Sequence, residues 1–516
     1  MEPPLQTPQP PTHRYNTRSR NTTTIPPAKL PPEPSTPEAS RKQTITASPP
    51  PWELHGRPPP RFTVDLSLPP EHRYDHIIPH MKPALEQGDV LGLFSSLISS
   101  VTPNAPLLRA SLHLLTRVAF RRVHSDEETA ELRGISRSTG QPMYLLVAFN
   151  VLLDLLLGCT SGGVRYDDGS SSRSHMVHFR TLDWSMDPLR HIVIELDFVT
   201  HRDGPVIATT VGYFGYVGVI TGVRKGLSLS LNHRATHDRS TLSKRLSYRW
   251  HQVMVLLGQR PSISSTLRHH LFTTSPATRR SPKQKHNPII TKREKPQPTT
   301  TTPDMPTILN ALTHAPSTAA YLIFCTPTAA YALEQDNHTA RIHTSSTLLT
   351  TCNHDVAEED SFTQLVPTNR VSTTVKEHRW IPFLSSSSPS ESPQAPTASP
   401  SFEESDGDSE SSASVDFTAE EIAQLILEDS ITRKETVNSV WASRLEQRRL
   451  RKPSSDGVGL EDVLHMLGAE EISGEPTHYA VVMDPEHGKV LWRRVYDVGE
   501  LEPASDSDSD LDSVSA

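Results

Sequence analysis

One of the three cysteines in the chain lies where an apolar run gives way to short β-rich segments. This is Cys159, which is followed by Thr160, Ser161 and two glycines. Downstream, the motif HFRTLDW carries Arg180 and Asp183. A cation near a thiol favours the nucleophilic thiolate, and a carboxylate can hold the base that activates it. The residue types therefore suggest nucleophilic catalysis by Cys159, although an isolated cysteine is more often an inert core residue.

Two asparagines further along the chain suggest how an oxyanion would be stabilised. Asn232 and Asn353 each end a β-rich run, and a side-chain amide can donate a hydrogen bond to an oxyanion. Asparagine at the end of a strand is, however, normally a turn residue. The residues alone leave the catalytic and the structural interpretation open.

The composition argues against several other kinds of site. Three cysteines without a C-x-x-C pair do not suit a disulfide framework or zinc bound by thiolates. The adjacent His269 and His270 border a low-complexity stretch, which does not favour a metal site there. We therefore expect no metal and no cofactor. The net charge of −8, from 59 acidic and 51 basic residues, gives no reason to invoke nucleic acid.

The elements that must position these residues fall into two groups along the chain. Before Cys159, apolar residues recur at helical spacing, and the run 143–157 predicts a buried helix that stops at Gly158. After Cys159 the pattern changes to many short β-rich runs, with helices predicted at 241–257 and 418–449. Segregated helices and strands of this kind predict an α+β layered domain.

The composition also predicts how the chain is divided. With 46 prolines among 516 residues and only 35% hydrophobic residues, a uniformly packed globule is not expected. An N-terminal helical segment, 58–158, and a catalytic domain, 159–498, would form the ordered part. Low-complexity composition predicts disorder in the N-terminal region, two inserts and an acidic tail. These are residues 1–57, 277–304, 384–416 and 499–516.

Seven segments, in the same order, resemble the acid ceramidase and N-acylethanolamine-hydrolysing acid amidase family. They are RFTVDLSLPPEHR (61–73), ELRGIS (131–136), Cys159-Thr160-Ser161, Arg180 to Asp183, YFGYVGVITGVRKGLSLSLNHR (213–234), Asn353-His354-Asp355 and Asp429 to Arg433. Members of this family are N-terminal nucleophile hydrolases with an αββα core. The resemblance therefore implies an αββα sandwich here, and collinear motifs are far more specific than any single match.

The resemblance implies that Cys159 becomes an N-terminal nucleophile. The precursor would cleave between Gly158 and Cys159, and the freed α-amino group would act as general base for the thiol of the same residue. Because an α-amine has a pKa of about 7.7–8.0, it suits this task at mild pH. The thiolate would then attack an amide carbonyl and form a thioester that water hydrolyses.

The resemblance also implies roles for the neighbours of Cys159. Asp183 would bind the α-amine, and Arg180 would orient the nucleophile or the carbonyl. Asn353 would contribute to the oxyanion hole, and Arg433 would bridge to the catalytic cluster. The leading hypothesis for the substrate is a ceramide-like N-acyl sphingoid base, cleaved to a fatty acid and a sphingoid base. N-acylethanolamines or other linear amides are an alternative, and an inactive lipid-binding relative is another.

The chain departs from the family pattern at three places. Asn232-His233-Arg234 stands where Asn-Glu-Arg is common, so His233 replaces a carboxylate that would influence self-cleavage. Gly158 replaces a bulkier apolar residue. No cysteine precedes Cys159, so the two fragments of the expected heterodimer would be held by packing alone.

The resemblance and the N-terminal sequence disagree about the compartment. The segment 91–120 is a candidate for transient contact with a membrane or an acyl chain. The N-terminus shows no apolar leader region, which predicts no signal peptide, whereas the resemblance implies a lysosome-like compartment.

Overall fold

The computed structural model describes residues 55–87, 114, 116–152, 158–169, 173–272, 304–359 and 419–501. The expectations for the N-terminal region, the two inserts and the acidic tail fall almost wholly outside these residues. Most of the segment 91–120 also lies outside them.

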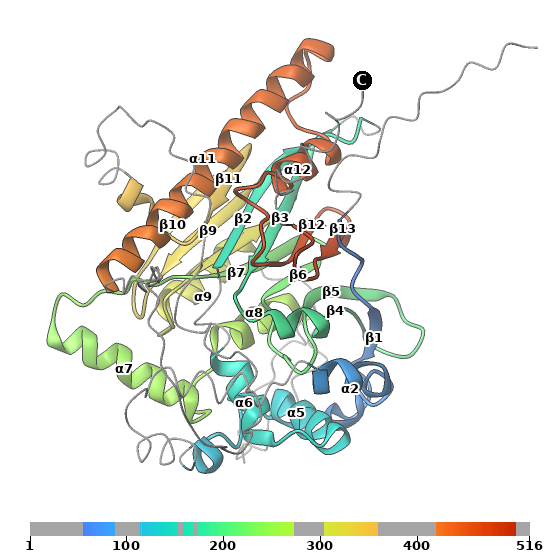
Figure 1. The fold of residues 1–516 in the computed structure, drawn as a ribbon, viewed down its shortest axis with the longest axis vertical. Coiled ribbons are helices and arrows are strands. Elements are labelled where there is room, and N and C mark those ends of the chain that lie inside the picture. The colour runs from blue at the N-terminus through green and yellow to red at the C-terminus, as the bar shows by residue number, and fades with distance from the viewer. Residues whose placement is uncertain are drawn as a thin grey trace, which may run out of the picture. The chain divides into compact units, whose positions relative to one another are not determined.

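Two β-sheets form the centre of the fold (Figure 1). The strands of the larger sheet follow the order β1 (Arg61–Asp65), β4 (Val193–Val199), β5 (Val206–Tyr213), β6 (Thr221–Arg224), β7 (Leu227–His233), β8 (Ala320–Cys325), β9 (Ala330–Gln335) and β10 (Ala340–Ser345). Those of the smaller sheet follow the order β11 (Leu348–Thr351), β2 (Gly158–Tyr166), β3 (His175–Asp183), β12 (Thr477–Asp484) and β13 (Lys489–Val495). Among the described strands, only β1 and β4 pair in parallel; the other pairings are antiparallel.

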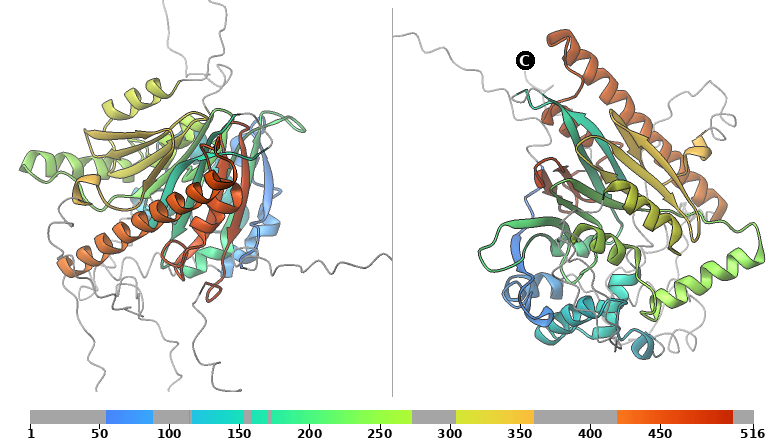
Figure 2. Two further views of the ribbon diagram at one scale, coloured as in Figure 1. Left: turned by 90° about the horizontal axis from the view of Figure 1, so that it is seen from above. Right: turned by 180° about the vertical axis from the view of Figure 1, so that it is seen from behind.

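The central strands are buried on both faces, which requires a layer on each side of each sheet. Every residue of β4, β8 and β12 is buried. One face of each sheet is covered by the other sheet, since β2 contacts β7, β8 and β9. Helix α8 (Ile263–Phe272) packs on β5, β6 and β7, while α11 (Ala419–Arg451) and α12 (Leu460–Leu467) cover β11 and β3 (Figure 2). The layers are thus helix, sheet, sheet and helix, and the α+β prediction is confirmed.

The described residues before Gly158 supply β1 and a group of helices. These are α2 (Ile78–Gln87), α5 (Asp126–Thr139) and α6 (Met143–Leu152), which lie together beside β1 (Figure 1). Helix α5 begins where the Ser125 hydroxyl accepts the Glu128 N–H, 3.3 Å apart, and ends at Gly140, whose φ of 80° suits glycine. Within the described residues, no helix combines the length and apolar character needed to cross a bilayer.

A buried ion cluster joins the segments on either side of Gly158-Cys159. Arg268 of α8 donates to both carboxylate oxygens of Glu131 in α5, at 2.6 and 2.8 Å. Arg73 also donates to Glu131, at 2.8 Å, and Glu128 lies 3.9 Å from Arg268. Together with the β1–β4 pairing, these non-covalent contacts link the two segments.

Most predicted elements match the structure, and the differences have physical causes. Helix α7 (Leu242–Leu256) begins after Thr241, whose hydroxyl caps it, as the pattern at 241–257 predicted. The prediction that Gly158 stops a helix is wrong. Gly158 is the first residue of β2, because its backbone is already paired with Asp183 of β3. The short helices α8, α9 (Met305–His314) and α12 were not predicted.

Candidate active site

Cys159 is the second residue of β2, and its side chain faces the space between the two sheets. Antiparallel pairing places Leu182 opposite Cys159 and Arg180 opposite Ser161. Residues two apart in a strand share a face, so Arg180 and Cys159 project on the same side. The Arg180 Nη2 donates to Cys159 Sγ at 3.1 Å. The register of the hairpin therefore brings Cys159 and Arg180, which are 21 residues apart in sequence, into direct contact.

The thiol of Cys159 is protonated in this environment. The side chain is 0% exposed. Burial raises the pKa of the Cys159 thiol to about 11, and Arg180 opposes that rise without cancelling it. Arg180 is itself fully buried and held in place, since its Nη1 donates to the Ile220 carbonyl at 2.6 Å. A thiol with so high a pKa needs a nearby base at the moment of attack.

The main-chain nitrogen of Cys159 is also held by a side chain. It donates to Asn353 Oδ1 at 2.9 Å, and Asn353 follows directly on the end of β11 and Cys352. The Asn353 Nδ2 donates to the His233 carbonyl at 2.8 Å. In this state the amide therefore turns its oxygen toward Cys159, and its donor group is engaged elsewhere.

Arg433 of α11 approaches the same strand from the outer face of the smaller sheet. Its Nη1 donates to Thr160 Oγ1 at 3.1 Å and its Nη2 to Asn353 Oδ1 at 3.1 Å. The same Nη1 lies 3.5 Å from Asp183 Oδ2. Asp429, one helical turn earlier, accepts from Arg433 Nε at 2.8 Å and so orients the guanidinium. One buried cation thus connects three residues that surround the main chain of Cys159.

Asp183 lies beside Gly158 in the strand pair, at the end of β3. Its carboxylate accepts a hydrogen bond from Thr477 Oγ1 at 2.8 Å. Burial raises the pKa of the Asp183 carboxyl to about 6, while Arg433 and Thr477 act in the opposite direction. The carboxyl therefore changes its charge at mildly acidic pH.

Asn232 and His233, at the end of β7, contribute differently. Asn232 Oδ1 accepts from Ser161 Oγ at 2.8 Å, and its Nδ2 donates to the Thr351 carbonyl at 3.0 Å. These bonds connect β7 of one sheet with β2 and β11 of the other. His233 takes part in the described contacts through its main-chain carbonyl, which accepts from Asn353.

Sequence reasoning missed Thr160 and Thr477 as parts of the site. Thr160 was recognised only as a neighbour of Cys159, and its contact with Arg433 depends on how α11 packs. Thr477 begins the strand THYAVVMD, and only the pairing of β12 with β3 brings it to Asp183. No local signal distinguishes either residue from an ordinary strand threonine.

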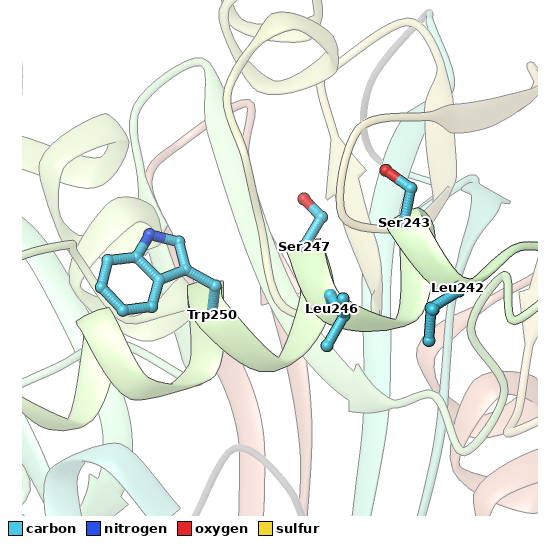
Figure 3. A pocket seen from close by; sticks show the side chains of 5 residues that line it. All are labelled: Leu242, Ser243, Leu246, Ser247 and Trp250. Carbon is cyan, nitrogen blue, oxygen red and sulfur yellow. The ribbon is translucent and has the colours of Figure 1, made fainter.

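A second candidate surface lies on α7, where large apolar side chains face solvent. Leu242, Leu246 and Trp250 are 62%, 60% and 58% exposed, and their spacing of four residues places them on one face. With Ser243 and Ser247 they line a shallow open groove (Figure 3). Contiguous exposed apolar side chains of this kind mark contact sites.

Comparisons with known proteins agree with the motifs. The family model of the beta subunit of N-acylethanolamine-hydrolyzing acid amidase matches residues 57–120. Acid ceramidases of Rattus norvegicus and Mus musculus are 28% and 29% identical over 212 residues, which are 38% of this chain and 50% of each relative. The acid ceramidase of Homo sapiens is 26% identical over 212 residues, with the same coverage. Over these residues the chain is similar to members of the acid ceramidase and N-acylethanolamine-hydrolysing acid amidase family.

The chain spans about half the length of the curated proteins it matches. The solved structure of the Caenorhabditis elegans ortholog of N-acylethanolamine-hydrolyzing acid amidase is 14% identical, with a TM-score of 0.36. The structural match covers 65% of this chain and 99% of the Caenorhabditis elegans protein. Because this structural overlap is loose, the contacts around Cys159 carry the chemical argument.

Proposed function

We propose that this chain is an N-terminal nucleophile amidohydrolase that cleaves the amide bond of an N-acyl lipid with Cys159. One observation carries the proposal. Polar side chains hold both the sulfur and the main-chain nitrogen of Cys159, with Arg180 Nη2 at 3.1 Å from Sγ and Asn353 Oδ1 at 2.9 Å from N. A nucleophile that supplies its own base needs both atoms fixed, whereas an inert core cysteine needs neither.

Self-cleavage comes first in this mechanism. The Cys159 sulfur attacks the Gly158 carbonyl carbon, and the C–N bond breaks as the nitrogen takes up a proton. The product is a thioester between the Gly158 carbonyl and Cys159 Sγ, together with a free α-amine. Water then hydrolyses the thioester and leaves a new C-terminus at Gly158. Asp183, which lies beside Gly158 in the strand pair, holds the new ammonium group.

Substrate hydrolysis uses the same atoms. The α-amine takes the thiol proton, which the raised pKa of Cys159 otherwise retains at neutral pH. The sulfur attacks the amide carbonyl of the substrate, and the ammonium returns the proton to the leaving nitrogen. A thioester with the fatty acid remains and is hydrolysed by water. Asn353 orients the amine through Oδ1. To donate to an oxyanion, the Asn353 Nδ2 must first break its hydrogen bond with the His233 carbonyl.

Access to the sulfur depends on cleavage. Cys159 is 0% exposed in the uncleaved chain, so a substrate reaches Sγ only after neighbouring groups move. Breaking the bond at Gly158 frees the residues immediately before Cys159 to move away from the sulfur. We therefore expect amidase activity to appear only in the cleaved protein.

The apolar face of α7 supports a lipid as the substrate. Leu246 and Trp250 face solvent, and Lys244, Arg245 and Arg249 lie on the same helix. An exposed helix face that carries Leu and Trp and is bordered by Arg side chains suits the surface of an anionic membrane. We propose that α7 brings the enzyme to such a surface, where its substrate resides.

This membrane contact is tested by co-sedimentation with phosphatidylserine-containing vesicles. The double variant Leu246→Ser/Trp250→Ser should lose most of its binding and keep the stability of the parent, since both side chains are exposed. The variant Ser243→Ala/Ser247→Ala, on the same helix, is the matched control. Equal binding by the two variants would refute a role for the apolar face.

The order of events at Gly158-Cys159 gives the main test of function. The purified full chain is incubated between about pH 4 and pH 8, the range in which the carboxyl and the α-amine titrate. A C-terminal fragment whose first residue is Cys159 is expected. Cys159→Ala should stay intact, while Cys325→Ala, at another fully buried cysteine, should cleave like the parent. A chain that stays intact at every pH contradicts the proposal.

Turnover by the cleaved protein then identifies the substrate. We propose ceramide, because the matched relatives are acid ceramidases. A panel of ceramides and N-acylethanolamines distinguishes the two lipid classes, and faster turnover of the ethanolamides would replace the ceramide proposal. Cleaved protein that binds these lipids without hydrolysing them would identify an inactive relative.

A further inference from the structure

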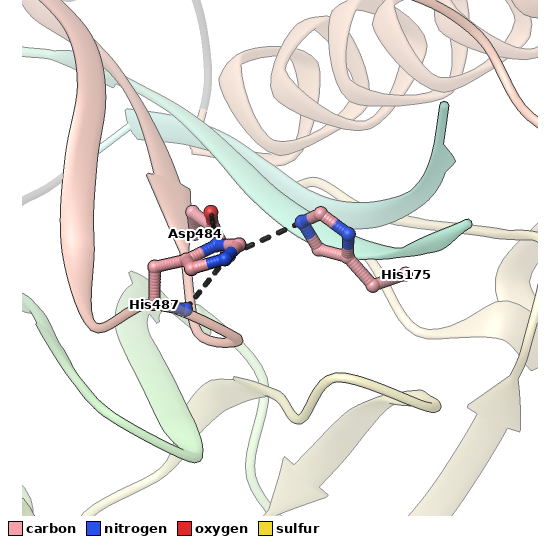
Figure 4. Close-up of side chains that lie close together, drawn as sticks. All are labelled: His175, Asp484 and His487. Carbon is pink, nitrogen blue, oxygen red and sulfur yellow. Dashed lines mark hydrogen bonds and ion pairs between the residues drawn. The ribbon is translucent and has the colours of Figure 1, made fainter. Parts of the chain in front are cut away.

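Three side chains with metal-binding atoms meet at the other end of β3 from Arg180 and Asp183. His175 is the first residue of β3, Asp484 is the last residue of β12, and His487 lies in the turn before β13 (Figure 4). One ligand atom from each lies within 4.8 Å of the others. The cluster thus comes from β3, β12 and the β12–β13 turn, which are held together because β12 pairs with both β3 and β13.

The chemistry of the three donors suits a divalent transition metal. Imidazole nitrogen and carboxylate oxygen bind zinc at about 2.0–2.2 Å, which places neighbouring ligand atoms of a tetrahedral site about 3.3 Å apart. His175 Nε2 lies 3.2 Å from Asp484 Oδ1. His487 Nδ1 lies closer, 2.6 Å from Asp484 Oδ2, but its side chain is 57% exposed. A small rotation of this exposed ring is enough to admit an ion.

His175 supplies an independent observation. Its side chain is only 11% exposed, and Nε2 forms an ion pair with Asp484 Oδ1 at 3.2 Å that does not meet the geometric criteria of a hydrogen bond within the described residues. An imidazole nitrogen and a carboxylate oxygen at this separation have the spacing of two ligands of one ion.

The geometry points to a site for one divalent transition-metal ion, zinc being the best fit, bound by His175 Nε2, the Asp484 carboxylate and His487, with water completing the shell. The site is separate from Cys159, which pairs at the opposite end of β3 with Leu182. No sequence spacing reveals it, because about 300 residues separate His175 from its two partners.

The proposed ion would clamp the β12–β13 turn. This turn already touches the larger sheet, since the Gly226 N–H donates to the Pro485 carbonyl at 2.7 Å. The ion would add a bond from the turn to β3 of the smaller sheet. The expected role is therefore structural, a link at one rim of the two sheets.

Zinc content and thermal stability test the site in the full chain. After dialysis at about pH 7.5, the protein should retain one zinc per chain by elemental analysis. His487→Ala should lower zinc affinity at least about tenfold, the loss seen even when a ligand's supporting partner is disturbed. His201→Ala, at another exposed histidine, should bind zinc like the parent. Cobalt in place of zinc should give a visible absorption band that His487→Ala lacks.

Comparing melting temperatures with and without a chelator separates a metal ligand from a simple hydrogen bond. For a metal ligand, zinc raises the melting temperature of the parent but not of His487→Ala, and the two proteins melt together in chelator. If His487→Ala lowers the melting temperature equally with and without zinc, the contact with Asp484 is a hydrogen bond only. That result, or parent protein without retained zinc, would overturn the proposal.

Discussion

Arg268 gives the sharpest test of how the segments before and after Gly158 are joined. Glu131 in α5 is 0% exposed, and both of its oxygens accept from Arg268, at 2.6 and 2.8 Å. A third bond runs from Arg268 to the Val217 carbonyl at 2.6 Å. Arg268→Met keeps much of the side-chain volume and removes all three bonds. It leaves a buried carboxylate with Arg73 as its remaining cation.

The expected magnitude follows from that geometry. Removing one partner of a buried ion pair typically costs about 3–5 kcal/mol in the free energy of unfolding. Because Arg73 still neutralises part of the Glu131 charge, we expect the lower end, about 3 kcal/mol. Adding Glu131→Gln removes the unpaired charge, so the double variant should recover at least about 1 kcal/mol.

Urea unfolding of the uncleaved protein measures these values. The Cys159→Ala background keeps the chain in one piece, so that dissociation of fragments does not enter the measurement. The midpoint and slope of the transition give the free energy for the parent, both single variants and the double variant. A loss below about 1 kcal/mol for Arg268→Met, or strictly additive effects of the two substitutions, would refute the view that this pair stabilises the junction.

Two further predictions concern acidity and packing. Burial raises the pKa of the Glu128 carboxyl to about 7, so between about pH 4.5 and 7 the folded chain keeps a proton that the unfolded chain releases. Stability should therefore fall as the pH rises through this window, by up to about 1.4 kcal/mol per pH unit, and Glu128→Gln should flatten the profile measured by urea unfolding. In β2, a methyl group at Gly162 would overlap the Leu349 carbonyl, whereas one at Gly158 would meet Asp183 no closer than 3.4 Å. Gly162→Ala should thus lower the melting temperature. Gly158→Ala should leave both the melting temperature and self-cleavage near those of the parent. Similar losses of melting temperature in both variants would contradict this description of the strand.

The sequence predicted the parts of the site that depend on local pattern. HFRTLDW reads as a strand, and pairing that strand with the residues after Gly158 brings Arg180 to Cys159. The position of Asn353 at the end of a β-rich run suggested an oxyanion donor, but only the family motifs connected Asn353 and Arg433 with Cys159. The structure places both against its main chain.

What the sequence could not supply is register between distant elements. Thr477 reaches Asp183, and Asp484 reaches His175, only because β12 pairs with β3 in one alignment. A shift by one residue would turn every side chain to the other face. The error at Gly158 has a related cause, since an apolar run followed by glycine looks like a helix end until the partner strand is known.

The pairing of β1 with β4 has a consequence for how the protein must be made. β1 comes from the chain before Cys159 and occupies one edge of the larger sheet. A chain that began at Cys159 would leave the backbone groups of β4, a strand buried along its whole length, uncovered at that edge. Bare apolar edges recruit other strands and aggregate. In the proposed cleaved enzyme, the segment ahead of Gly158 would therefore remain part of the larger sheet, where β1 covers the edge of β4.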